Sequence, residues 1–170
     1  QRQMCIRDRS VFYDDWWQIQ KFYIASDMCT DDMWMGNTTQ DPGEYRDLAH
    51  YTGNTYSAGN TCQNFWQYRY KGILRSNVAI ERIPLVSFEN ESLKKRYIAE
   101  AKFLRAFHYF ELVKNFGGVP LVLGLKLPSE IVGIRRATAE ETYAQIEKDL
   151  LDAIPDLPKR SEYDCLLYTS

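Results

Sequence analysis

The segment that decides the fold is Glu100-Ala-Lys-Phe-Leu-Arg-Ala-Phe-His-Tyr-Phe-Glu-Leu-Val-Lys-Asn-Phe-Gly-Gly-Val-Pro-Leu-Val122. Its apolar side chains recur at three- and four-residue spacing, which places them on one face of a helix: Phe103, Phe107, Phe110 and Val113. Ala101, Leu104 and Leu112 widen that face until most of the helix is apolar, which indicates packing on more than one side. We therefore expect the phenylalanines and Leu104 in the core.

The same helix has a defined end and a few polar side chains. Gly117-Gly118 supplies a residue that can take the left-handed conformation, and Pro120 prevents the helix from resuming. We expect Arg105 to pair with Glu100 or Glu111 on the helix surface, and His108 to be a packed or hydrogen-bonded helix residue. No catalytic chemistry is visible in this segment.

Working outward, the periodicity predicts a mainly helical chain. The expected order is a short helix at 12–23, a long irregular loop at 27–64, helices at 65–83 and 92–116, an extended segment at 119–125, and a last helix after residue 138. Thr138 and Glu141 form a capping box at the start of that last helix, and Pro155 and Pro158 stop it. No clean internal repeat is apparent.

Composition excludes several functional classes. At 170 residues the chain is long enough for one domain with a real core, and its 45% hydrophobic and 26% charged residues are ordinary for a globular protein. The formal net charge of −2 does not favour binding to nucleic acid, which usually requires a basic surface. No stretch has the apolar length needed to span a bilayer. Aromatic residues make up 14%, which is the one compositional feature that favours ligand stacking, although most of these rings are expected to fill the core.

The two ends share an inverted DNA sequence. The tail Cys-Leu-Leu-Tyr-Thr-Ser is encoded by TGTCTCTTATACACATCT. The reverse complement of that string encodes Met-Cys-Ile-Arg-Asp, which is the sequence of residues 4–8. Inverted flanks of this kind resemble a translated sequencing adaptor, so we expect residues 1–9 and 165–170 to be artefacts and 10–164 to be a partial natural domain.

Without these flanks, two cysteines remain. Cys29 and Cys62 do not form a Cys-x-x-Cys pair, which argues against zinc or thioredoxin-like chemistry. They could form one disulfide in an exported protein or remain two separate thiols. We expect no cofactor.

Catalytic and metal-binding interpretations are weak. Asp27, Asp31 and Asp32 lie close together, but they lack the spacing and the glycine of a calcium loop, so we favour helix caps or solvated turn acids. No pair among the 23 acidic residues stands out as the acid and base of a glycosidase. His50 and His108 have no partners that would suggest a metal site or a catalytic triad. We therefore expect a protein that is not an enzyme.

Three ordered motifs resemble those of one family. The segment 100–122 is similar to the signature E-A-[RK]-F-L-R-A-x-x-Y-F-x-L-V-x-x-[FY]-G-x-V-P-L-V of the SusD/RagB family. Two flanking segments also resemble family motifs: W-x-x-x-Y-x-x-I-x-x-x-N at Trp66, Tyr70, Ile73 and Asn77, and the R-x-[ST]-x-x-E-x-Y element that begins at Arg136. Together the motifs extend from residue 66 to 158, and we identify the chain as an amino-terminal fragment of a SusD/RagB-type protein.

The resemblance implies a fold and a function. It implies tetratricopeptide-type antiparallel helix pairs with long irregular loops. It also implies a nutrient-binding, typically glycan-binding lipoprotein that is exposed on the cell outer membrane and attached only by a lipid anchor, which is absent from this fragment. Its expected partners are an oligosaccharide or other nutrient ligand and a TonB-dependent, SusC-like transporter.

The irregular segment 27–64 holds our candidate ligand-binding residues. Sugar recognition combines flat aromatic faces with amide or carboxylate groups that bind hydroxyls. The segment offers both kinds, and the predicted ligand-binding residues are Trp34, Asn37, Tyr56, Asn60 and Asn64. Trp66 is interpreted as structural because it begins a helical stripe.

Two other functions remain open at this point. A tetratricopeptide-like scaffold that binds protein partners would share the helix pairs but would need no aromatic and amide loop. A glycoside hydrolase fragment would require two carboxyl groups facing each other across a cleft.

Overall fold

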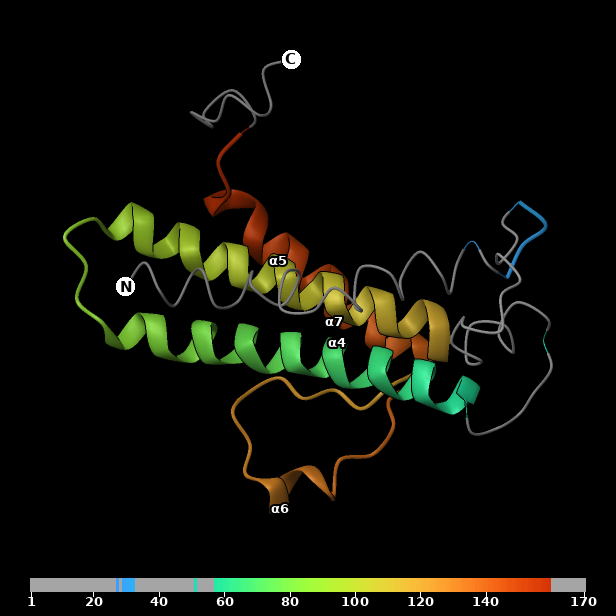
Figure 1. Cartoon of the computed structure of the whole chain (residues 1–170). Helices are drawn as coiled ribbons and strands as arrows, with labels where there is room; N and C mark the ends of the chain where they lie inside the picture. Colours follow the sequence, from blue (N-terminus) through green and yellow to red (C-terminus); the bar gives the residue numbers. More distant parts are fainter. Residues whose placement is uncertain (1–26, 28, 33–50, 52–56, 160–170) are drawn as a thin grey trace, which may run out of the picture. The chain divides into compact units, whose positions relative to one another are not determined.

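The structure, a computed structural model, describes residues 27, 29–32, 51 and 57–159 (Figure 1). The chain divides into two compact units, one of residues 9–71 and one of residues 72–170 together with 1–8. The described elements are α4 (Ser57–Arg82), η2 (Ile83–Leu85), α5 (Glu91–Phe116), α6 (Pro128–Ile131), α7 (Ala139–Ala153) and η3 (Ile154–Asp156). Within these residues the only β-type pairing named is an isolated bridge between Pro120 and Arg136. The prediction of a mainly α fold is confirmed.

Helix α4 begins earlier than the sequence predicted. The expected helix covered 65–83, whereas α4 runs from Ser57 to Arg82 and is followed by a 3₁₀ turn that contains Pro84. Its first turns hold Gly59, Asn60 and Asn64, residue types with low helix propensity, so the periodicity was lost there. Residues 57–64 were therefore wrongly assigned to a loop, because tertiary context can override a weak local preference.

Helix α5 has the predicted limits. Asn90 caps its start by accepting hydrogen bonds from the backbone N–H groups of Ser92 and Leu93 at 2.9 and 3.2 Å. The helix ends at Gly117, whose φ of 69° lies in the region that glycine adopts without steric cost. The Gly117 N–H donates to the Val113 carbonyl at 3.0 Å, which satisfies one of the last carbonyl groups of the helix.

The start of α7 is the predicted capping box. The Thr138 hydroxyl accepts from the Glu141 N–H at 3.1 Å, and the Glu141 carboxylate accepts from the Thr138 N–H at 2.8 Å. The helix ends at Ala153, and Pro155 lies in the 3₁₀ turn that follows.

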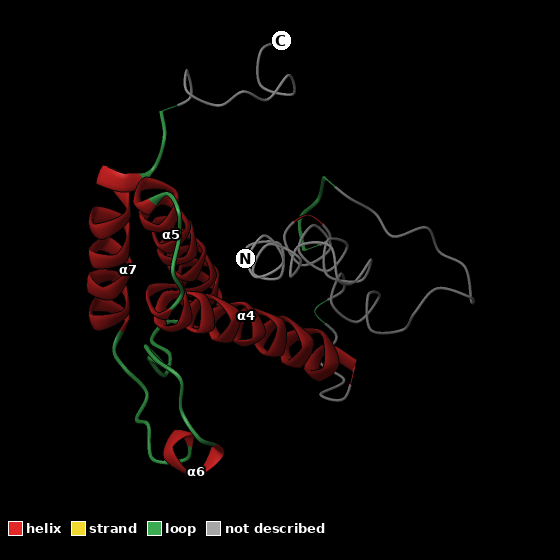
Figure 2. Ribbon diagram, turned by 90° about the vertical axis from the view of Figure 1, so that its left-hand side faces the viewer, coloured by secondary structure: helices red, strands yellow, loops and turns green. Residues whose placement is uncertain are grey.

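The helices of the second unit pack as antiparallel neighbours (Figure 2). Arg105 pairs with Asp149, whereas Lys102, one turn earlier on α5, pairs with Asp152, one turn later on α7. This reversed order shows that α5 and α7 run in opposite directions. The end of α4 packs against α5 around Ala79, Ile83 and Ala101, and the larger side chains Ile80, Phe88, Tyr97 and Ile98 surround them. This arrangement agrees with tetratricopeptide-type pairing.

The core face of α5 differs from the predicted one. Phe103 and Phe110 are 46% and 40% exposed, so their assignment to the core was wrong. The fully buried side chains lie on another face of the helix: Ala101, Ala106, His108, Tyr109 and Leu112. Because apolar residues surround α5 almost completely, periodicity alone could not identify which face meets α4 and α7.

Other expectations lie outside the described residues. These include the short helix at 12–23, the two flanks at 1–9 and 165–170, and His50. None of the described helices has the length and apolar character required to cross a membrane.

Candidate functional site

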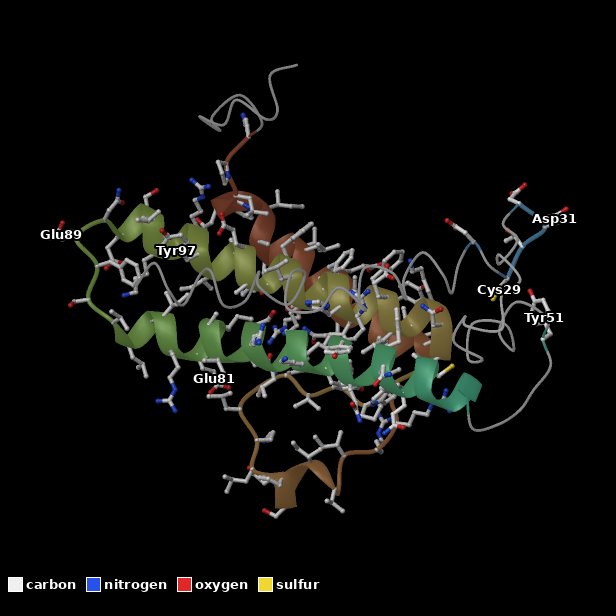
Figure 3. The ribbon with its side chains drawn as sticks, viewed as in Figure 1. Cys29, Asp31, Tyr51, Glu81, Glu89 and Tyr97 are labelled. Carbon is white, nitrogen blue, oxygen red and sulfur yellow. The ribbon has the colours of Figure 1, made fainter. Side chains whose placement is uncertain are left out.

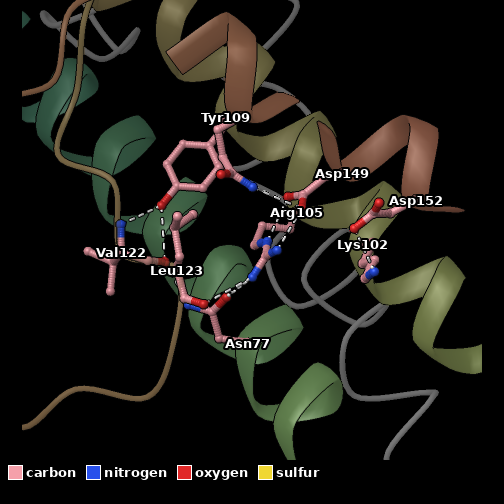
Figure 4. A network of polar contacts seen from close by, with 9 residues as sticks. Asn77, Lys102, Arg105, Tyr109, Val122, Leu123, Asp149 and Asp152 are labelled. Carbon is pink, nitrogen blue, oxygen red and sulfur yellow. Dashed lines mark hydrogen bonds and ion pairs between the residues drawn. The ribbon is translucent and has the colours of Figure 1, made fainter. Parts of the chain in front are cut away.

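A buried polar network joins α4, α5 and α7 (Figure 4). The Arg105 side chain on α5 donates from Nε and Nη2 to the two carboxylate oxygens of Asp149 on α7, at 2.7 and 2.6 Å. Its Nη1 donates to the Asn77 side-chain oxygen on α4 at 2.9 Å and to the Leu123 carbonyl at 3.2 Å. The planar guanidinium suits this arrangement, because it offers several donors in fixed directions and binds a carboxylate with two parallel bonds.

The network corrects the prediction for Arg105. We expected a surface pair with Glu100 or Glu111, but the arginine is buried and binds Asp149 instead. Glu100 accepts from Arg96, and Glu111 pairs with Lys114. Spacing along one helix predicted a local pair, whereas the true partner lies 44 residues away on another helix.

The second role of the network is to hold the extended segment that follows α5. Asn77 Nδ2 donates to the Val122 carbonyl at 2.7 Å. The Tyr109 hydroxyl accepts from the Val122 N–H at 2.7 Å and donates to the Val122 carbonyl at 3.1 Å. Burial raises the pKa of Tyr109 above its ordinary value, so the phenol stays protonated and able to donate. The backbone of this segment is satisfied by side chains rather than by a neighbouring strand.

Further contacts define the base of a surface excursion at residues 119–137. Glu81 on α4 accepts from the Leu125 N–H at 2.8 Å (Figure 3). The Ala137 N–H donates to the Val119 carbonyl at 3.2 Å, next to the bridge between Pro120 and Arg136. α6 lies within this excursion, apart from α5 and α7 in both views (Figures 1 and 2).

Arg136 closes the same base. Its Nε and Nη2 donate to the carbonyl oxygens of Gly118 and Phe116, each at 2.6 Å. These carbonyl groups lie at the end of α5, where backbone acceptors have no partner within the helix. The motif from Arg136 to Glu141 therefore caps two helices: Arg136 caps the end of α5, and Thr138 with Glu141 caps the start of α7.

The predicted ligand-binding residues belong to the first unit. Trp34, Asn37 and Tyr56 lie outside the described residues. Asn60 and Asn64 lie on α4 rather than in the expected loop, and Asn64 is half-buried. Because they are four residues apart, positions 60 and 64 occupy the same face of the helix. The set stays a prediction.

The described part of α4 in the first unit is rich in aromatic and cationic side chains. The Trp66 and Tyr70 rings lie 4.9 Å apart between centroids with an angle of 38° between their planes. The Arg69 guanidinium lies 4.8 Å from the centre of the Phe65 ring. Each of these four side chains is half-buried, which agrees with the structural interpretation of Trp66.

The acidic cluster in the first unit forms a solvated turn. Asp27, Asp31 and Asp32 are exposed, and the Thr30 hydroxyl donates to the Asp27 carbonyl at 2.7 Å. Nearby, the Tyr51 hydroxyl donates to the Cys29 carbonyl at 2.5 Å (Figure 3). Across the residues that the structure describes, no group of three His, Cys, Asp or Glu side chains is arranged to hold a metal ion.

Cys29 and Cys62 are thiols in this structure. Burial, and to a smaller extent the nearby Cys62, raise the pKa of the Cys29 thiol. A thiol with a raised pKa is less reactive, because the thiolate is the nucleophile.

The sequence motifs define the protein's family. A family model described as "Starch-binding associating with outer membrane", of the SusD-like type, matches residues 17–170. The match includes both the helix pairs and the candidate ligand-binding segment. The chain belongs to the SusD-like family.

Individual relatives agree with this assignment. SusD-like protein P38 of Formosa agariphila is 34% identical over 93 residues, which are 54% of this chain and 18% of that protein. A solved structure named "Laminarin binding SusD-like protein" has 28% identity and a TM-score of 0.65, and the match covers 84% of this chain and 33% of that one. Surface glycan-binding protein A from Bacteroides uniformis has 24% identity and a TM-score of 0.77 over 96% of this chain and 36% of its own, which shows a shared fold.

The chain is much shorter than these relatives, since it spans less than a fifth of the curated proteins that it matches. Within that part, sequence reasoning identified the motifs but missed the tertiary role of their polar residues. Asn77, Arg105 and Tyr109 fall in the two helical motifs, and their pattern of polar letters among apolar ones was the available signal. They form the frame behind the excursion and belong to no described ligand site.

Proposed function

We propose that this chain is part of a surface glycan-binding lipoprotein of the outer membrane, which binds an oligosaccharide and passes it to a TonB-dependent, SusC-like transporter. The observation that carries the proposal is the SusD-like family match over residues 17–170. The similarity to a structure named for laminarin binding supports a carbohydrate as the ligand.

The proposed ligand contacts are Trp34, Asn37, Tyr56, Asn60 and Asn64. Indole and phenol rings can stack on the apolar face of a sugar, while amide groups bind its hydroxyls. Asn60 and Asn64 support this assignment because their positions lie one turn apart on α4 and can contact neighbouring hydroxyls of one ligand.

The proposed mechanism is binding and transfer without catalysis. A shallow stacking surface binds with modest affinity, because a small interface leaves little free energy after the cost of ordering the ligand. Modest affinity permits release to the transporter. The protein would therefore act by raising the local concentration of the glycan.

The first experiment tests glycan binding directly. The uninterrupted reading frame that contains this chain is expressed from its source DNA, and its mobility is measured in gels that contain laminarin, starch or another glucan. We expect at least one glycan to retard the protein, and Trp34→Ala or Tyr56→Ala to remove most of the retardation.

Matched controls come from the second unit. Tyr143 is an exposed aromatic residue on α7, and Asn115 is an exposed amide near the end of α5. Tyr143→Ala and Asn115→Ala should leave the glycan mobility unchanged. If no glycan retards the protein and a co-purifying protein binds it instead, the scaffold alternative replaces this proposal.

A further inference from the structure

Helix α7 has two different faces. Its buried residues recur at three- and four-residue spacing and face α5 and the end of α4: Thr142, Ile146, Asp149 and Ala153. This face is already occupied in the second unit by Arg105 and its neighbours.

The opposite face of α7 is apolar and exposed. Tyr143, Leu151 and Ile154 are 41%, 68% and 64% exposed, although large apolar side chains are seldom gathered on a solvated helix face. We define the outer face of α7 by the exposed positions Glu140, Tyr143, Ala144, Glu147, Leu151 and Ile154. Five of them follow one another at alternating spacings of four and three residues, which is the pattern of a helix that packs against a second helix.

The charges on this face point to the chemistry of its partner. Three carboxylates of α7 that lie elsewhere have cationic partners: Glu141 with Arg135, Asp149 with Arg105 and Asp152 with Lys102. No ion pair is formed by Glu140 or Glu147 with any side chain that the structure describes. Two copies of the chain would place these glutamates close to each other and would repel. A basic partner is favoured.

We propose that the outer face of α7 packs against a further amphipathic helix supplied by a later part of the same, longer polypeptide. That helix has aliphatic side chains against Leu151 and Ile154 and Lys or Arg opposite Glu140 and Glu147. Relatives of which this chain spans only 18 to 36% have ample length for such a helix. Stacked helix pairs also require a polar face at the last helix of an array, and α7 does not present one.

Hydrogen exchange provides the first test. The amide exchange of residues 139–154 is compared in the 170-residue chain and in the product of the uninterrupted reading frame. A packed outer face should slow exchange in the longer product by about tenfold or more, because opening of α7 then also breaks the added contacts.

Substitutions provide the second test. Leu151→Glu combined with Ile154→Glu should lower the Tm of the longer product by several degrees and leave the Tm of the 170-residue chain nearly unchanged. Glu147→Lys should lower the Tm of the longer product more than Glu147→Gln does. The matched control is Leu85→Glu, since Leu85 is 74% exposed and lies off this face.

The outcomes separate clearly. Slower exchange and a Tm loss confined to the longer product support the proposal. Equal exchange in both proteins, an unchanged Tm, or a reading frame with no further helical segment overturns it. Because neither readout involves a glycan, the proposed binding function is tested independently.

Discussion

Arg105 on α5 and Asp149 on α7 form a buried ion pair with two parallel hydrogen bonds of 2.7 and 2.6 Å. The same guanidinium also binds Asn77 on α4 and the backbone of Leu123. One side chain therefore connects three helices and the extended segment after α5. Buried charges are tolerated in this way only when every partner is well placed.

Loss of one partner of this pair should be costly. We expect Arg105→Ala to lower the free energy of unfolding by about 3–5 kcal/mol, because Asp149 is left buried without its cation. Urea denaturation followed by circular dichroism measures the change.

The control is the double variant Arg105→Met with Asp149→Leu. It should lose clearly less stability than Arg105→Ala, since no isolated charge remains buried. If Arg105→Ala were no worse than the double variant, the isolated carboxylate would not be the source of the loss.

Gly118 should not tolerate a side chain. A Cβ at this position would lie 2.0 Å from the Ala137 carbonyl oxygen, which belongs to the backbone and cannot rotate away. We expect Gly118→Ala to destabilise the protein by about 2 kcal/mol or more, through displacement of the connection between α5 and α7. Thermal denaturation gives the comparison.

Gly133 provides the matched control, because a Cβ there would meet nothing within 4 Å. Gly133→Ala should be neutral or slightly stabilising, since alanine restricts the unfolded chain. Equal losses at both positions would contradict the steric explanation for Gly118.

The Tyr109 hydroxyl should control the backbone at Val122. It accepts from the Val122 N–H and donates to the Val122 carbonyl. We expect Tyr109→Phe to cost about 1–3 kcal/mol and to speed amide exchange at Val122 more than at residues within α5. Tyr143→Phe, at an exposed tyrosine, should change neither quantity. Unaltered exchange at Val122 would show that the segment is held by other contacts.

The capping box of α7 should weaken in acid. The hydrogen bond from Arg135, followed by the backbone hydrogen bond at Thr138, lowers the pKa of Glu141 to about 2. Because the folded-state pKa lies below the unfolded one, its contribution is fully present above about pH 4.5 and is lost as the pH falls toward 2. The Tm difference between the native chain and Glu141→Gln should therefore shrink over this range and vanish near its lower end. A constant difference between pH 6 and pH 2 would exclude ionisation of Glu141 as the cause.

Local signals in the sequence predicted α5 and α7 well. The Gly117-Gly118 pair with Pro120, and the Thr138 box with Pro155, act within one or two turns, so their effects are visible from neighbouring letters. The start of α4 was missed because Gly59, Asn60 and Asn64 give no helical signal of their own. The candidate ligand residues depend on a segment whose chemistry, but not geometry, can be read from its letters.

The sequence by itself determined the family, the mainly helical fold class and the limits of two helices, since motifs, caps and breakers act over short distances. Only the tertiary structure decided which face of α5 is buried and that Arg105 binds Asp149 rather than Glu100 or Glu111. The reason is physical. An almost uniformly apolar helix can pack on any side, and a long cationic side chain can reach many carboxylates. The choice among them depends on which helices lie next to it and on which buried groups would otherwise have no partner.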